Sequence, residues 1–305
     1  MVAYVIKRVG LALLVIFVVS LVGFLALRLT GDPAVAMAGE ASSEADIRNI
    51  RLQYGFDRPI LIQYADWLGR AVRGDFGVSN YFRLPVSDLI MSRFPTTALL
   101  AAFSISFALI ISIPLGIIAA VRQNSWIDRL ALLFAVSGQA MPNFWLALLL
   151  IVLFSVTYPL LPPSGSGEWV NFIMPTIVLG THAMPALMRL TRNGMLDVLA
   201  SDYMRTARAK GLRWYTVLFK HGLRNAMIPL VALTAVQFGF LLSGSIVTEA
   251  IFALHGLGHL AWESITRRDI PTVQAVLIIL ATFYTLLTLL GDLLNAWLDP
   301  RIRVS

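Results

Sequence analysis

Charge is scarce in this chain of 305 residues, and cysteine is absent. Charged residues make up 13% of the sequence, whereas a soluble globular domain averages about 25%. A surface that is so poor in charge excludes an ordinary soluble domain. The lack of cysteine excludes disulfides and thiolate metal sites, and leaves the redox compartment undetermined. Hydrophobic residues reach 58% and the net charge is +7, which together indicate a membrane protein rather than a partner of nucleic acid.

Motifs for catalysis or phosphate binding are also lacking. No GxxxxGK[ST] sequence occurs, and no paired catalytic groups lie at bilayer depth, so neither an ATPase nor an intramembrane enzyme is predicted. His255 and His259 have the i, i+4 spacing of a metal pair. The glycines between them would break the helix that this spacing requires, and only Glu249 and Glu263 lie nearby. We therefore expect a glycine-rich outer turn, with no metal and no catalytic site.

Six apolar segments are long enough to cross a bilayer as helices, which takes about 20 residues each. They cover 9–27, 97–120, 130–160, 172–190, 228–253 and 272–298. The third segment is too long for one perpendicular crossing and contains Pro142, which predicts a tilt or a kink. The fold class is therefore an all-α membrane protein.

The distribution of cations sets the orientation. With the N-terminus inside, six cations of the segment 200–225 and eight others, 14 of the 24 Lys and Arg residues, face the cytoplasm. Most of the remainder lie in one long loop, and long loops cross largely regardless of charge. Both termini are thus predicted to be cytoplasmic. The start of the chain also resembles a signal peptide, but its apolar run exceeds the usual 7–15 residues, which favours a retained first span.

Four regions follow from this topology. Residues 1–29 carry the first span, 30–95 form an outer region, 96–298 hold spans two to six, and 299–305 are a cytoplasmic tail. In the outer region, aromatic, Leu and Ile residues recur at helical spacing, which predicts a small folded cap with two short helices.

The segment 200–225 is basic and helix-prone, and lies between two spans. Its cations are Arg205, Arg208, Lys210, Arg213, Lys220 and Arg224. Ser201 or Asp202 can cap a short helix, and Gly211 can end it in the left-handed conformation. Leu199, Tyr203, Thr206 or Ala207, and Lys210 share one face, which suits docking to a soluble partner. The alternative is a solvated loop that serves topology alone, or that attracts anionic lipid.

This segment resembles the coupling loop of membrane subunits of type I ATP-binding-cassette (ABC) importers. The match is firm at Gly211 and loose at Arg205-Thr206-Ala207, which stand for Glu-Ala-Ala, while Arg224 replaces the usual proline as in the dipeptide and oligopeptide permease branch. Further stretches similar to that branch occur in order along nearly the whole chain, at 29–34, 55–60, 74–79, 141–145, 161–165, 189–192 and 298–303. Residues 237–246 and the C-terminal half around them are most similar to the glutathione permeases.

The resemblance implies a permease subunit of the bacterial inner membrane, with no ATPase activity of its own, that forms half of a path for di- or oligopeptides or glutathione. A second homologous permease, two cytoplasmic ATPases that bind ATP and Mg²⁺, and a soluble substrate-binding protein would complete the importer, alongside membrane lipid and without nucleic acid. The coupling helix would comprise Tyr203, Met204, Arg205, Thr206, Ala207, Arg208, Lys210 and Gly211.

The residues that line the path are less well defined. Gln237, Gly239, Ser243 and Ser245 lie in the fifth span and could line it, although small residues there also suit helix packing. His182 lies deep in the fourth span, where an ionisable group is a functional candidate. The alternatives are a nickel or other small-solute permease of the same branch, and an ion-coupled secondary transporter. The near absence of midplane charges argues against the latter.

Overall fold

The computed structural model describes residues 2–38 and 42–298, so the tail predicted at 299–305 lies outside it. Four helices are each long and apolar enough to cross a membrane: α1 (Val2–Thr30), α5 (Val86–Val121), α8 (Ile173–Leu199) and α14 (Ile270–Leu298). Two bent pairs of helices raise the number of spans to six. Among the described residues the only β-type pairing is an isolated bridge between Val78 and Pro85, so this part of the chain is all-helical, as the sequence predicts.

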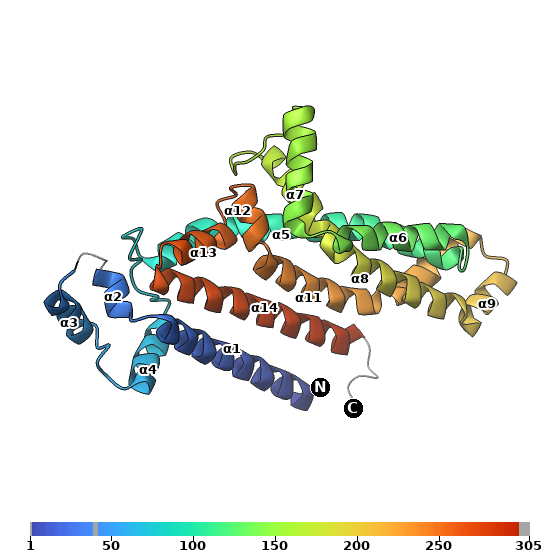
Figure 1. Ribbon diagram of the computed structural model, residues 1–305. Coiled ribbons are helices and arrows are strands. Elements are labelled where there is room, and N and C mark those ends of the chain that lie inside the picture. The colour runs from blue at the N-terminus through green and yellow to red at the C-terminus, as the bar shows by residue number, and fades with distance from the viewer. Residues whose placement is uncertain (1, 39–41, 299–305) are drawn as a thin grey trace.

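The predicted third span is broken. It consists of α6 (Trp126–Ala140) and α7 (Asn143–Ile151), which continues as a π-helix over Val152–Thr157, and the two parts meet at 94°. Met141 is extended because Pro142 follows it, and a residue before proline avoids the helical region. The expected kink is therefore confirmed as a sharp turn, and α7 projects away from the bundle (Figure 1).

The fifth span also differs from the prediction. A π-helix (Thr216–Leu223) and the short α10 (Arg224–Ala226) lead into α11 (Ile228–Gly244) through a bend of 52°. The helix ends at Gly244, so the predicted 228–253 is too long. Residues Ile246–Ile251 form a separate helix, α12, which precedes α13 (Leu257–Thr266). Glu249 of α12 is a buried carboxylate that accepts a hydrogen bond from the N–H of His259, near the start of α13.

The outer region contains three short helices rather than two: α2 (Pro33–Ala38), α3 (Glu44–Gln53) and α4 (Ile60–Ala71). Ser43 and Asp46 form a capping box at the start of α3. The next long helix, α5, begins at Val86, about three turns before the predicted residue 97. Its first turns contain the charged residues Asp88 and Arg93. The apolar run from which the span was predicted therefore begins later than the helix does.

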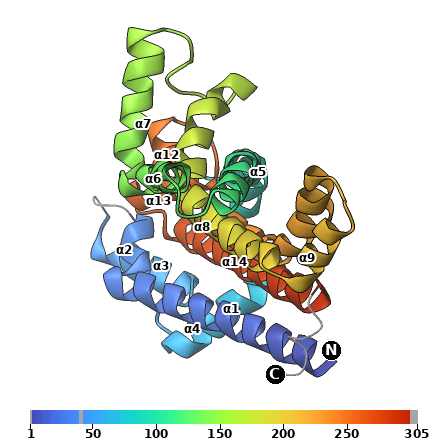
Figure 2. The same ribbon diagram turned by 90° about the vertical axis from the view of Figure 1, so that its right-hand side faces the viewer.

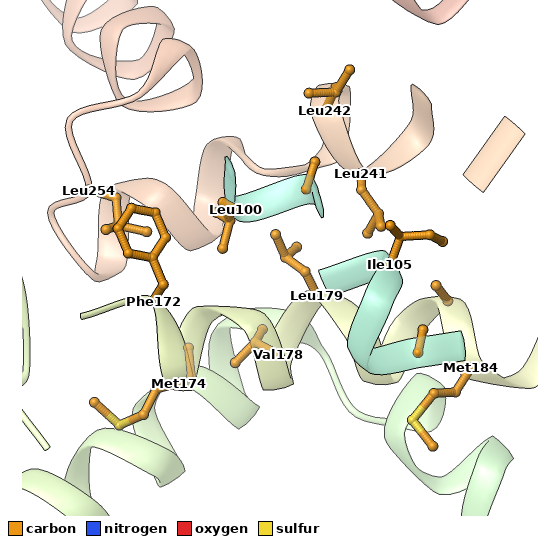
Figure 3. Packing of buried hydrophobic residues seen from close by; sticks show 14 of the residues in the cluster. Leu100, Ile105, Phe172, Met174, Val178, Leu179, Met184, Leu241, Leu242 and Leu254 are labelled. Carbon is orange, nitrogen blue, oxygen red and sulfur yellow. The ribbon is translucent and has the colours of Figure 1, made fainter. Parts of the chain in front are cut away.

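The core lies between α5 and α8, which pack closely through glycines. A Cβ atom added at Gly116 would lie 2.7 Å from Thr191 Cβ, and one at Gly180 would lie 2.9 Å from the carbonyl oxygen of Ser104. Beside these contacts is a buried apolar cluster to which α11 also contributes. Figure 3 shows it, with Leu100 and Ile105 of α5, Val178 and Leu179 of α8, and Leu241 and Leu242 of α11.

A second set of contacts joins α14 to α11 and α1. Gly239 of α11 lets Tyr284 of α14 approach, since an added Cβ would lie 3.1 Å from its ring. Arg8 of α1 forms a salt bridge of 2.8 Å with Asp292 of α14. The helix α9 (Asp202–Ala209), the start of α1 and the end of α14 lie at one end of the bundle, whereas α3, α4 and α13 lie at the other (Figures 1 and 2). This placement agrees with cytoplasmic termini and an outer cap.

Candidate functional site

The predicted coupling helix is present as α9, which follows α8 after two residues. Ser201 is its N-cap residue, and its backbone is extended, with φ −71° and ψ 153°. The Ser201 hydroxyl, however, donates a hydrogen bond of 2.5 Å to the carbonyl oxygen of Val198 and accepts none from the backbone N–H groups of α9. The cap position is thus as predicted, and its side-chain hydrogen bond is not formed.

Gly211 ends the helical segment with a φ of +72°. The sequence predicts this left-handed conformation, and the structure confirms it. A Cβ atom added to Gly211 would meet nothing within 4 Å. The positive φ therefore favours glycine here, whereas the space around residue 211 would admit a side chain.

The faces of α9 correct one part of the predicted docking surface. Met204 is fully buried and Ala207 is 8% exposed, and both pack on Val217 of the same chain. Ala207 therefore faces the chain itself rather than a partner. The outward surface consists of Tyr203, Arg205, Thr206, Arg208 and Lys210, all of which are exposed.

Contacts within the loop hold this outward surface in place. The Tyr203 hydroxyl accepts a hydrogen bond of 3.0 Å from Asn225 Nδ2, and the Arg208 guanidinium lies 5.1 Å from the centre of the Trp214 ring. Two turns of helix are too short to be stable alone, so these contacts and the buried Met204 supply the stability. The surface is preformed in the absence of a partner.

A cavity of about 410 Å³ opens where the third span breaks. Gln139 and Asn143 border it from the two sides of the break, and His182 borders it from α8, together with Ala140, Met141, Pro142, Phe144, Gly244 and Val247. The His182 ring stacks on Phe240 with centroids 6.0 Å apart, and its Nδ1 atom is buried with no hydrogen-bond partner. Three residues with polar side chains thus border one cavity between the spans.

None of the four predicted pathway residues borders this cavity, although Ser243 and Ser245 flank Gly244, which does. Gly239 packs on Tyr284, and Ser245 is buried, where its hydroxyl donates to Glu249 at 2.7 Å. The Ser243 hydroxyl donates to the carbonyl oxygen of Gly239 at 3.2 Å, and Gln237 is partly buried. The sequence had singled out His182. It offered a signal for Gln139 and Asn143 as well, since two amide side chains flank the proline that breaks an apolar span.

Glu249 explains the glycine-rich turn at 255–259. Its carboxylate accepts hydrogen bonds from Thr97 Oγ1 at 2.8 Å, Ser245 Oγ at 2.7 Å and the His259 N–H at 3.0 Å. A Cβ atom at Gly256 would overlap both Glu249 and Thr97. The glycine is needed so that the start of α13 can close over the carboxylate.

The two histidines of this turn have their rings 5.6 Å apart, and His255 Nδ1 shares a hydrogen bond of 3.0 Å with Ser166. No group of three or more Asp, Glu or His side chains suited to a metal occurs in the described part of the chain. The sequence-based expectation of a turn without a metal stays a prediction.

Comparison with known families decides the class of protein. The family described as "Binding-protein-dependent transport system inner membrane component" matches residues 112–304, and the N-terminal region of the same kind of membrane component matches residues 1–101. The chain belongs to this permease family. Membership decides against an ion-coupled secondary transporter, the other class of transporter that the sequence had left open.

Individual relatives agree with the family. This permease is 44% identical over 304 residues to the glutathione transport system permease protein GsiC of Escherichia coli (strain K12), which covers 99% of each chain. The GsiC protein of Shigella dysenteriae serotype 1 (strain Sd197) matches at the same identity and coverage. Among solved structures, the inward-facing MetNI methionine ABC transporter is similar with a TM-score of 0.57 at 19% identity, over 69% of this chain and 96% of that chain.

The comparisons confirm several predictions made from the sequence. This permease is a multi-pass protein of the inner membrane with the fold of an ABC importer permease, and it is a transporter subunit rather than an enzyme. It works with ATPase and substrate-binding partners, as its family does.

Proposed function

We propose that this permease imports short peptides of the glutathione type, the cargo named for its relatives. The observation that carries the proposal is the 44% identity to GsiC, which extends over 99% of both chains and leaves no region of this permease unmatched. Nickel complexes and other small solutes of the same branch are the second candidate.

In this proposal α9 is the docking element for a cytoplasmic ATPase. Its outward side chains Tyr203, Thr206 and Lys210 fall at helical spacing. The helix α9 lies at the same end of the bundle as the start of α1 and the end of α14 (Figure 1). Because contacts within the chain hold α9 in place, a partner can transmit force through it without first ordering it. ATP and Mg²⁺ would be bound by two such ATPase subunits, and a second homologous permease would complete the path.

The path would pass the cavity at the break between α6 and α7. Broken helices form substrate sites in membrane proteins because backbone and side-chain polar groups there meet water instead of lipid. Gln139, Asn143 and His182 offer both donors and acceptors, which suit the amide and carboxylate groups of a peptide. Of the four residues predicted from the sequence, Ser243 and Ser245 would adjoin this path, because they flank the lining residue Gly244.

Uptake measurements test the proposal. Labelled glutathione, a labelled dipeptide and labelled nickel would be offered to cells that lack their own importers and produce this permease with the subunits encoded beside it. We expect uptake of glutathione or dipeptide that ceases when the ATP-binding lysine of the partner ATPase is replaced. Uptake of nickel alone would favour the second candidate. Peptide uptake that survives the lysine replacement and collapses with a protonophore would contradict the ATP-driven mechanism.

A further inference from the structure

The helix α4 of the outer region packs against the outer half of α1 (Figure 1). Tyr64 is 6% exposed, and its hydroxyl shares a hydrogen bond of 2.6 Å with Ser20 Oγ. The Tyr64 ring lies edge-on to Phe17 and Phe24, with centroids 6.0 Å and 5.4 Å away, and Trp67 also contacts Phe24. The contact is therefore made by side chains within α1 and not at its outer tip.

This contact places α4 at bilayer depth. The charge-free run of α1 ends at residue 27, next to Arg28, and Ser20 precedes that point by about 10 Å at 1.5 Å per residue. An amphipathic helix that rests in a membrane interface buries its apolar face by about 5–10 Å. The position of α4 on α1 falls in this range, whereas a cap in water would contact only the end of α1.

The two flanks of α4 differ in chemistry. At 100° per residue, the side facing α1 contains Tyr64, Trp67 and Ala71. One flank beside it is entirely apolar, and consists of Leu61, Ala65, Leu68 and Val72. The other is polar, and consists of Gln63, Asp66 and Arg70. Leu61 is 70% exposed and Val72 is 80% exposed, so the described part of the chain leaves most of the apolar flank uncovered.

Hydrogen bonds show which flank points outward. Gln63, on the polar flank, donates from Nε2 to the carbonyl oxygen of Phe56 at 3.1 Å, and the Phe56 ring lies 4.6 Å below the guanidinium of Arg28. Arg28 marks the outer end of α1. Because α4 crosses α1 instead of running along it (Figure 1), its opposite flanks point toward opposite ends of α1. The apolar flank therefore points toward the centre of the bilayer.

We propose that α4 is an interfacial helix that lies in the outer leaflet of the membrane, with Leu61, Ala65, Leu68 and Val72 among the lipid acyl chains and Asp66 and Arg70 at the headgroups. The outer region then lies partly in the outer leaflet of the membrane and is not solely a cap exposed to water. The proposal needs only that α1 crosses the membrane with residue 30 on the outer side. It does not depend on the identity of the cargo.

The absence of cysteine allows a clean test. Single cysteines would be introduced as Leu61→Cys and Val72→Cys on the apolar flank, and as Asp66→Cys and Arg70→Cys on the polar flank as matched controls. Each would carry a nitroxide label in the assembled importer, reconstituted in phosphatidylethanolamine and phosphatidylglycerol vesicles. Collision with oxygen, which concentrates in acyl chains, and with a water-soluble nickel chelate would be measured by power saturation.

We expect the ratio of oxygen to chelate collisions to be severalfold higher at positions 61 and 72 than at 66 and 70. Equal and high chelate collision at all four positions would place α4 in water and overturn the proposal. Low collision with both reagents at 61 and 72 would show that a protein subunit covers the apolar flank, and this outcome would overturn it as well.

Discussion

Arg192 of α8 holds Asp128 of α6 through two parallel hydrogen bonds, Nε to Oδ1 and an Nη atom to Oδ2, each 2.7 Å long. The Asp128 side chain is 4% exposed and that of Arg192 is 17% exposed. The same carboxylate accepts the N–H of Asn124 at 3.0 Å, and Ser125 caps α6 just before it. One ion pair thus fixes both the start of α6 and its position on α8.

Removal of one partner of this pair should destabilise the permease. Asp128→Asn leaves the Arg192 charge without its partner, and breaking a buried pair in this way costs about 3 kcal/mol. The expected result is a lower midpoint of thermal unfolding in detergent and a lower membrane level. Arg189→Ala, which changes an exposed cation on the same helix, is the control. Equal midpoints for the two variants would show that the ion pair does not hold α6 in place.

Replacement of Gly211 should act through backbone strain alone. Gly211→Val forces a β-branched residue to a φ of +72°, at a cost of roughly 1–2 kcal/mol, although its side chain has free space. We expect weaker copurification of the ATPase and lower uptake at matched membrane levels. Gly211→Asn should retain most of both, because Asn tolerates the left-handed region. If the two variants behave alike, the left-handed turn is not what α9 requires.

Two neighbouring positions on α9 should give different defects. Thr206→Glu places a charge on the outward surface, and should reduce ATPase copurification while leaving the unfolding midpoint unchanged. Ala207→Glu buries a charge against Val217, and should lower the midpoint and the membrane level first. A loss of copurification with Ala207→Glu alone, at normal stability, would restore Ala207 to the docking surface.

A methyl group at Gly256 should disturb the buried Glu249. Gly256→Ala overlaps the carboxylate and Thr97, and overpacking of this kind costs about 1–3 kcal/mol. We expect a lower unfolding midpoint, measured in detergent. Gly167→Ala is the control, since nothing lies within 4 Å of the added methyl group. A normal midpoint for Gly256→Ala would show that α13 can move away from Glu249 without loss.

Changes at the cavity should affect transport and not assembly. His182→Leu removes the ring nitrogens while keeping much of the bulk beside Phe240. Copurification with the ATPase should remain normal, whereas peptide uptake should fall severalfold through a higher apparent KM. Ser137→Ala, at an exposed position of α6 outside the cavity lining, is the control. Normal uptake with His182→Leu would place the path elsewhere.

The long helices were predictable from the sequence because a helix that crosses lipid needs a long run of apolar residues. Residues 9–27 and 272–298 fall within α1 and α14, and Pro142 marked the turn in the third span. The left-handed Gly211 was predictable for a similar reason, since few residues other than glycine adopt this conformation at low cost.

Other features depend on contacts that are distant in sequence. Helix α5 begins among charged residues, so apolarity does not mark its start at Val86. The inward face of Ala207 depends on Val217, which returns through a π-helix that no local pattern indicates. The role of Glu249 depends on Thr97, which lies far away along the chain. Helical spacing shows which residues share a face, but not which face meets the rest of the protein.

The continuity of α8 has a mechanical consequence. This helix begins at Ile173, directly after Phe172, and passes His182. It ends two residues before α9, so one continuous helix joins the cytoplasmic loop to the cavity. From His182 to Leu199 it measures about 26 Å at 1.5 Å per residue. Pro185, which lacks the N–H for an i−4 bond, places the softest point of the helix within one turn of His182. If a partner displaces α9, we therefore expect α8 to bend near Pro185, beside the cavity.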